Sequence, residues 1–287
     1  MTVENIDRSK MTFEQAEGVH PLPRQLKLRE VSPQLRAVLW DFVYSLLSGS
    51  SRDGNIVGRW AYILRDMHVQ RFHRMADEFR PNAQRVFPDV KQVFAGGSYL
   101  EIFGFLEWAL RHPHCPHDFA YQLDKRLRQC QAAYCVVNQD TISPISSEEE
   151  RATIERAFAN LASTEFNGAR QHLKLAAQQA TAGEWSACIR ESINAVESTV
   201  RCIDPKAQDL RPALATLERQ GTVHGSLKEG FLKLYGYASD EKGLRHSLAF
   251  DGVAKVDETD GLFMLGACAS FVSYLINKGR AAGLIKE

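Results

Sequence analysis

Ala133-Tyr-Cys-Val-Val-Asn-Gln-Asp-Thr-Ile-Ser-Pro-Ile-Ser-Ser-Glu-Glu-Glu150 separates two helical patterns in this chain of 287 residues. Its first half is rich in β-branched and aromatic residues, with the turn residues Asn138-Gln-Asp140 in the middle. Such a run predicts a small β-hairpin near residues 133–143, and no other stretch gives a convincing strand signal. A mostly α fold with one hairpin is therefore expected.

The end of the same stretch predicts a domain boundary. Ser147 and Glu150, or the same residue types one position earlier, stand at the spacing of a capping box, in which each residue bonds the backbone N–H of the other. Three consecutive glutamates also favour a helix N-terminus, where the helix dipole attracts negative charge. We therefore expect a first domain over residues 1–145 and a second over residues 146–287.

Apolar residues recur at helical spacing on both sides of the hairpin. Residues 1–29 lack that periodicity and hold two prolines, which predicts an arm along the surface. Ser32-Pro33 then starts a helix, as N-cap and first helical residue. Further helices are expected over residues 60–79, 94–110 and 119–130 in the first domain, and from residue 147 and over 166–177, 185–203, 211–219, 226–234, 242–249 and 260–277 in the second.

The last of these helices is the nearest approach to a membrane span. Residues 261–277 carry no charge, but they fall short of the roughly 20 apolar residues that cross a bilayer. We expect a buried helix and no membrane partner. The expected fold class is therefore mostly α with two helical domains, the first containing the hairpin and the second a helical bundle.

Composition excludes several classes of protein. The chain has 35 Lys and Arg against 35 Asp and Glu, whereas dedicated nucleic-acid or membrane-surface binders usually carry an excess of one sign. A local basic patch stays open. Six cysteines without a C-x-x-C pair, and no apolar leader, are typical of reduced thiols in a cytoplasmic protein. The common nucleotide, hydrolase and metalloprotease motifs do not occur, and no cofactor is expected.

One cluster has the residue types of a metal site. His112-Pro-His114-Cys115-Pro-His117 places four such residues within six positions. Structural zinc needs four tetrahedral ligands, usually as spaced pairs, and the two prolines restrict the backbone that would wrap an ion. We expect a loop and no metal, with a zinc site as the alternative.

Two other segments carry candidates for acid–base chemistry. The segment Leu234 to Leu248 is expected to be a loop and holds Arg245 and His246. Histidine transfers protons near neutral pH and arginine binds phosphate with two hydrogen bonds, which suits attack by a ribose 2′-hydroxyl on the adjacent phosphate. A buried arginine paired with an acid is the structural alternative. The other segment is a polar stripe on the helix over residues 185–203, made of Arg190, Asn194, Glu197 and Arg201, with Glu191 at its edge. A solvated helix face is its simplest interpretation.

These residues resemble a known family. Ile189-Arg-Glu-Ser-Ile-Asn-Ala-Val-Glu-Ser198 and Leu234-Tyr-Gly-Tyr-Ala-Ser-Asp-Glu-Lys-Gly-Leu-Arg-His246 are similar to the HEPN-type C-terminal half of AbiJ-like abortive-infection proteins. Leu35-Arg-Ala-Val-Leu-Trp40 and Ile142-Ser-Pro-Ile145 are similar to the sensor-type domain that precedes it. The resemblance spans most of the chain and is more specific in its C-terminal part.

The resemblance implies a HEPN bundle that commonly dimerises and cleaves RNA, such as tRNA or mRNA, without metal, as a toxin released by a phage-derived trigger. By position it assigns the catalytic roles to Arg245, His246, Asp240 and Glu197. It assigns substrate binding to Glu191, Asn194 and Tyr237.

The chain departs from the general HEPN pattern, in which a histidine follows the arginine after four to six residues. Those positions after Arg245 hold Phe, Asp and Gly, whereas Arg219 and His224 do have the spacing, in an expected loop away from a helix start. Two functions are carried forward. One is a metal-independent endoribonuclease, and the alternative is a non-catalytic RNA- or protein-binding scaffold in which Arg245, Asp240 and Glu197 form a structural ion network.

Overall fold

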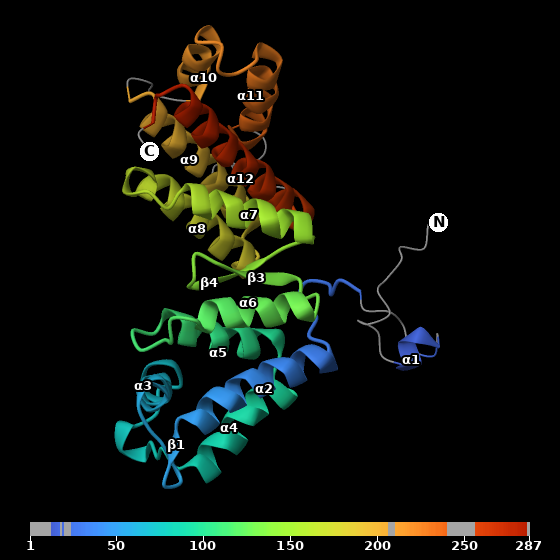
Figure 1. Ribbon diagram of the computed structural model, residues 1–287, viewed down its shortest axis with the longest axis vertical. Helices are drawn as coiled ribbons and strands as arrows, with labels where there is room; N and C mark the ends of the chain where they lie inside the picture. Colours follow the sequence, from blue (N-terminus) through green and yellow to red (C-terminus); the bar gives the residue numbers. More distant parts are fainter. Residues whose placement is uncertain (1–12, 18, 20–23, 206–209, 240–255, 286–287) are drawn as a thin grey trace, which may run out of the picture.

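The computed structural model of the protein describes residues 13–17, 19, 24–205, 210–239 and 256–285. Figure 1 shows an elongated stack of helices with a β-hairpin across its middle. Within the described residues the strands form only two sheets of two strands each, so the predicted mostly α fold class is confirmed.

The residues before the hairpin form short helices, stacked below it in Figure 1. Ser32 caps the first long helix, its hydroxyl accepting the N–H of Leu35 at 3.1 Å, as predicted. The elements are α1 (Phe13–Ala16), α2 (Pro33–Gly49), β1 (Ser51–Arg52), β2 (Asn55–Ile56), α3 (Arg59–Asp66), α4 (Ala83–Gly96), α5 (Tyr99–Arg111) and α6 (Phe119–Gln129).

The hairpin is the layer between the two groups of helices. It consists of β3 (Tyr134–Val137) and β4 (Thr141–Pro144), paired antiparallel with Val137 opposite Thr141, and it confirms the predicted hairpin. Strand β3 packs against α6 and α7, and β4 against α5 and α8. Successive side chains of a strand point to opposite faces. Helices cover both faces of this hairpin, so its side chains pack into two cores.

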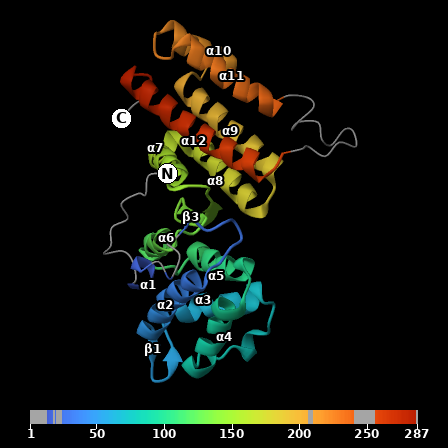
Figure 2. The same cartoon turned by 90° about the vertical axis from the view of Figure 1, so that its right-hand side faces the viewer.

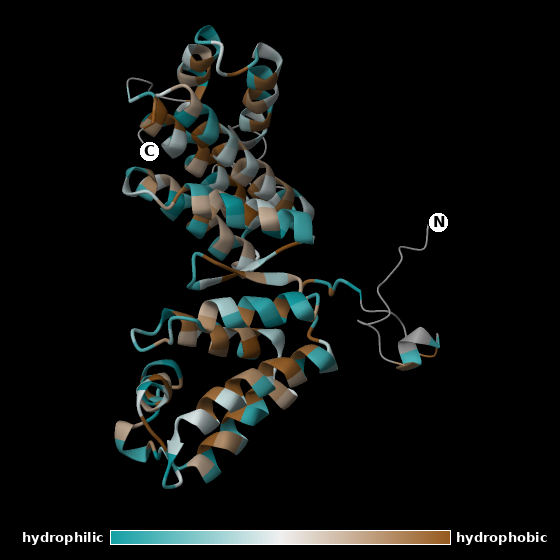
Figure 3. Ribbon diagram, in the orientation of Figure 1, coloured by the Kyte–Doolittle hydropathy of each residue, from teal (hydrophilic) through white to brown (hydrophobic). Residues whose placement is uncertain are grey.

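The residues after the hairpin form a bundle of longer helices, seen from the side in Figure 2. Ser147 caps the first of them by accepting the N–H of Glu150 at 3.2 Å, as predicted. Apolar and polar residues alternate around these helices (Figure 3), which is the pattern of amphipathic helices that share a core. The elements are α7 (Glu148–Asn160), α8 (Asn167–Ala182), α9 (Trp185–Ile203), α10 (Leu210–Arg219), α11 (Gly225–Ser239) and α12 (Glu258–Ala281).

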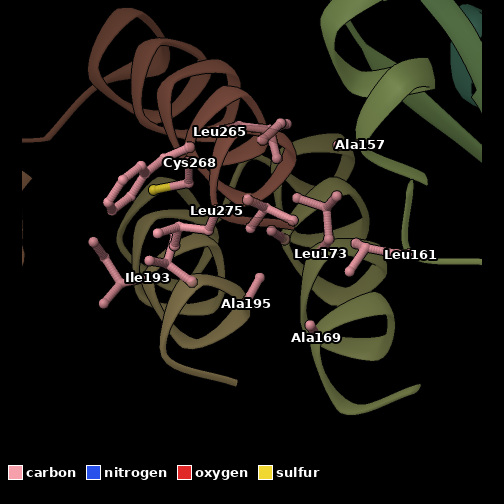
Figure 4. Packing of buried hydrophobic residues seen from close by; sticks show 14 of the residues in the cluster. Ala157, Leu161, Ala169, Leu173, Ile193, Ala195, Leu265, Cys268 and Leu275 are labelled. Carbon is pink, nitrogen blue, oxygen red and sulfur yellow. The ribbon is translucent and has the colours of Figure 1, made fainter. Parts of the chain in front are cut away.

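Helix α12 is the central helix of this bundle. It packs against α7, α8 and α9, and Figure 4 shows Leu265, Cys268 and Leu275 directed at the side chains of α8 and α9. It is also the one helix among the described residues that is long and apolar enough to cross a membrane, yet 61% of its most apolar window is buried inside the fold. The burial is that of a core helix, which confirms the expected buried helix.

Four expectations for the elements are wrong. Strands β1 and β2 form a second antiparallel pair, with Ser51 opposite Ile56, where the sequence pattern predicts only one hairpin. Helix α4 lies where no helix was expected, since the sequence pattern placed a helix start only near Phe94. The helix expected over residues 60–79 ends at Asp66 and continues as a π-helical turn, Met67–Arg71, before His73 takes a φ of 54°. Residues 234–239 are the last turns of α11 and not a loop. The helix expected over residues 242–249 lies outside the described residues.

Candidate functional site

The polar stripe of α9 faces two neighbouring helices through its two acids. On one side, Glu197 accepts a hydrogen bond from the hydroxyl of Tyr235 on α11 at 2.8 Å. Its other oxygen lies 3.4 Å from Arg201 Nη2, one helical turn away. The Glu197 side chain is only 19% exposed, so these two contacts fix its carboxylate in a half-buried setting.

On the other side, Glu191 pairs with a histidine from α8. The Nδ1 atom of His172 lies 2.8 Å from Glu191 Oε2. Arg190 Nε lies 3.9 Å from the second carboxylate oxygen, and the Arg190 side chain is 60% exposed. Glu191 and Arg190 are candidates from the sequence, whereas His172 is not, because its partner lies nineteen residues further along the chain. Only the packing of α8 on α9 brings the two together, and no local motif marks the pair.

The end of α11 meets the start of α12, and the start of α12 packs on the first turn of α9. Tyr237 near the end of α11 faces Asp260 in the first turn of α12, and burial together with the carboxylates of Asp260 and Asp257 raises the pKa of the Tyr237 hydroxyl. Gly261 packs against the ring of Trp185, where α9 begins. The residues assigned to substrate binding therefore lie on two neighbouring helices, α9 and α11.

Three of the predicted catalytic residues cannot be placed. Asp240, Arg245 and His246 lie outside the described residues, between the end of α11 and the start of α12. Glu197 and Tyr237 are both placed, but the partners that the structure describes for them are Tyr235, Arg201 and Asp260. Asn194 lies on the same α9 stripe and is half-buried.

Two histidines of the loop over residues 112–117 contact nearby side chains. His112 Nε2 lies 3.2 Å from Asp66 Oδ2, and the ring of His114 stacks on Tyr62 with centroids 4.7 Å apart. Burial raises the pKa of the Cys115 thiol to about 11, so the thiol is protonated at neutral pH. Among the described residues, no group of three or more His, Cys, Asp and Glu side chains could hold a metal ion.

Arg219 and His224, which have the HEPN spacing, bond only to nearby residues of the chain in the described structure. The Arg219 guanidinium donates to Ala215 O and Thr216 Oγ1 within α10, and His224 Nδ1 accepts the N–H of Ser226. The expectation that His224 lies away from a helix start is wrong, because it directly precedes α11. Its position is therefore compatible with a functional role and needs a direct test.

Comparison with known proteins assigns the first part of the chain. A family model described as AbiJ N-terminal domain 4 matches residues 11–160, which is more than half of the 287 residues and ends with the last residue of α7. No curated protein and no solved structure matches the chain. The domain division at residue 145 and the HEPN assignment of the later helices stay predictions. The chain belongs to the AbiJ N-terminal domain 4 family, and so to the abortive-infection proteins that carry this domain.

Proposed function

We propose that the protein is a bacterial anti-phage protein in which residues 11–160 sense a phage-derived trigger and the helices that follow cleave RNA without metal. Family membership supports the role in abortive infection. In this proposal the protein acts in the cytoplasm as a homodimer, on tRNA or mRNA. The HEPN-type ribonuclease activity rests on the resemblance of the C-terminal residues and on the geometry of the bundle.

The observation that carries the ribonuclease proposal is the contact of the end of α11 with both the polar stripe of α9 and the start of α12. Tyr237 of α11 faces Asp260 of α12, and Gly261 packs on Trp185 of α9. Helices α11 and α12 flank in the chain the segment that holds Arg245 and His246. The α11 flank of that segment is thus anchored at the polar stripe of α9, where Tyr235 donates to Glu197.

The proposed mechanism is transesterification at a phosphodiester. His246 takes the proton of a ribose 2′-hydroxyl, the 2′-oxygen forms a bond to phosphorus, and the bond from phosphorus to the 5′-oxygen breaks. Arg245 neutralises the charge that develops on the phosphate oxygens. The leaving 5′-oxygen takes a proton from solvent, and the products carry 2′,3′-cyclic phosphate and 5′-hydroxyl ends. Asp240 or Glu197 orients the arginine or the histidine.

The test is metal-free incubation of the purified full chain with total tRNA and a structured mRNA. Arg245→Ala and His246→Ala should each abolish cleavage without changing the thermal melt. The matched control is the pair Arg219→Ala and His224→Ala, which should cleave at the parent rate. Loss of cleavage in the control pair alone would move the active site to the start of α11.

The second candidate function is the non-catalytic scaffold. The observation that favours it is the half-buried carboxylate of Glu197, which is already held by Tyr235 and Arg201 as in a structural network. In that case Arg245→Ala should lower the free energy of unfolding by about 3–5 kcal/mol, the usual cost of breaking a buried ion pair. A catalytic arginine is removable with little loss of stability, so urea denaturation of this variant separates the two functions.

A further inference from the structure

We propose that His172 and Glu191 form a proton-transfer pair on the α8–α9 face, and that the substrate class of this site is an RNA phosphodiester. The identity of the substrate rests on the proposed ribonuclease function. The site itself rests on contacts among described residues, and it places an acid–base group on the bundle independently of residues 240–255.

The first support is the geometry of the pair. Nδ1 of His172 lies 2.8 Å from Glu191 Oε2, a hydrogen-bond distance. The Glu191 side chain is 18% exposed and the His172 side chain is 37% exposed, so a shielded carboxylate holds a ring that solvent reaches. A carboxylate on one ring nitrogen fixes the tautomer and the ring orientation.

The second ring nitrogen is therefore the reactive atom. With the proton on Nδ1 donated to Glu191, Nε2 carries a lone pair. Within the described part of the chain, His172 makes no protein hydrogen bond other than the one to Glu191. This arrangement of carboxylate, imidazole and open nitrogen is the one that general bases use.

The third support is the neighbouring arginine. Arg190 Nε lies 3.9 Å from Glu191 Oε1, too far for a hydrogen bond, and its side chain is 60% exposed. Its guanidinium therefore has donors left for a phosphate, which it can bind with two hydrogen bonds. Asn194 lies one helical turn further along α9 and adds an amide on the same stripe. A base, a phosphate ligand and an amide lie together on one helix pair.

The step that this set can perform is proton removal from a ribose 2′-hydroxyl, in which His172 takes the place given above to His246. The proton moves to Nε2 of His172, the 2′-oxygen bonds to phosphorus, and the bond to the 5′-oxygen breaks. The 5′-oxygen takes a proton from solvent, and Nε2 later returns its own proton to solvent, so no other reactant is needed. DNA lacks the 2′-hydroxyl and should bind without being cleaved, which makes RNA the substrate class.

The test compares cleavage by the parent with that of His172→Ala and Glu191→Gln. Because a positioned acid or base contributes about 100-fold or more to a rate, His172→Ala should slow cleavage by at least that factor. Glu191→Gln keeps the hydrogen bond but not the charge, and should cause a smaller loss. His117→Ala replaces an exposed histidine far along the chain, in the loop before α6, and should cleave at the parent rate.

A second pair of variants tests the phosphate ligand. Arg190→Ala should weaken RNA binding, whereas Arg201→Ala removes an arginine of similar exposure that Glu197 already holds. The Arg201 variant should bind RNA more tightly than the Arg190 variant. Equal loss in both would show a diffuse electrostatic effect and overturn the assignment of Arg190.

Binding gives a readout that does not depend on cleavage. A 2′-O-methyl oligonucleotide, which cannot be cleaved, should shift the imidazole Cε1–H resonance of His172 in the parent and not in Arg190→Ala. If the parent cleaves RNA and His172→Ala cleaves as fast, this inference fails and the proposed function stands. If the parent is inert but the resonance shifts, the proposed activity fails and the phosphodiester site stands. No shift in an inert parent overturns both.

Discussion

Arg151 is the largest of the fully buried residues in the described ranges, and 1% of its side chain is exposed. Its Nη1 atom lies 2.7 Å from Asp124 Oδ1 on α6, and Nη2 donates to Tyr134 O on β3 at 3.0 Å. Nε lies 3.1 Å from Glu148 Oε2, close enough for charge attraction but not aligned for a hydrogen bond. One side chain of α7 thus ties α6 and the hairpin together.

Replacement of Arg151 by Met should therefore destabilise the protein strongly. The substitution takes the buried cation from Asp124, whose side chain is 17% exposed, and leaves it only the half-exposed Arg128 at 3.8 Å. Breaking a buried pair costs about 3–5 kcal/mol. Urea denaturation followed by circular dichroism measures the loss. Arg156→Met is the matched control, because Arg156 is an exposed arginine on the same helix. Equal losses in the two variants would contradict a structural role for the buried guanidinium.

Ionisation of Glu107 lowers the stability of the native state as the pH rises. Burial raises the pKa of this carboxyl on α5, although the N–H of Ile142 and the Arg111 guanidinium, which lie 3.0 Å and 2.8 Å from its Oε1, oppose the rise. Because the native pKa is the higher one, the native state binds more protons than the unfolded state, and stability falls as pH rises from the usual glutamate range of about 4.3 through the raised value.

Glu107→Gln should remove that loss, so its stability relative to the parent should increase across this pH window. Urea unfolding at several pH values from 4 to 7 tests it. Glu149→Gln is a control of opposite sign, since backbone and Ser147 hydrogen bonds at the start of α7 lower the pKa of Glu149. That variant should lose stability relative to the parent as pH rises. The same slope in both variants would rule out the assigned causes.

Single contacts of this kind are the part of the molecule that the sequence predicts least. The residue types of Arg190, Glu191 and Glu197 and their shared helix face follow from spacing alone, and the structure places them there. The partners His172 and Tyr235 come from other helices, and their contacts depend on how α8 and α11 pack on α9. Spacing along a chain contains no information on that packing.

Helices and strands were easier to predict than contacts, and the misses have physical causes. Ser32 and Ser147 cap the helices that they were expected to cap, because capping is a local interaction. Helix α4 was missed because Pro88 lies inside it, where proline removes a backbone hydrogen bond. Val86, Val90 and Phe94 are buried at intervals of four residues, and this apolar face outweighs the cost of the proline.

Two glycines of α12 should respond in opposite ways to alanine. A Cβ at Gly266 would lie 3.6 Å from Glu150 Cγ, an ordinary contact, so Gly266→Ala should stabilise the helix by about 0.5–1 kcal/mol. A Cβ at Gly261 would lie 2.7 Å from Cε3 of Trp185, a rigid ring, so Gly261→Ala should destabilise the protein despite the same gain in helix propensity. Thermal melts of the two variants decide, and a stabilised Gly261→Ala would show that α12 and α9 are not tightly packed there.

At the scale of the whole molecule, the buried apolar residues of the described ranges form two clusters that share the hairpin. Tyr134 and Ile142 belong to the cluster formed with α2 to α6, whereas Cys135 and Val137 belong to the cluster formed with α7 to α12. Alternate residues of β3 therefore enter different cores, as the two-residue period of a strand requires. Polar contacts join the same layers, since Thr181 of α8 donates to Ile142 O at 2.7 Å, while Glu107 of α5 accepts the N–H of the same residue.

Because the hairpin cannot unfold without exposing both clusters, the two halves should unfold together. Leu39 and Leu173 are fully buried in different clusters, and Leu→Ala at such sites costs about 2–5 kcal/mol. In a Trp185→Phe background the remaining tryptophans all precede residue 145, so fluorescence reports on the first half and circular dichroism on the whole chain. Leu39→Ala and Leu173→Ala should each move both transitions to the same lower urea concentration. If Leu173→Ala leaves the fluorescence transition unchanged, the halves unfold independently, and the hairpin does not couple the first half to the bundle.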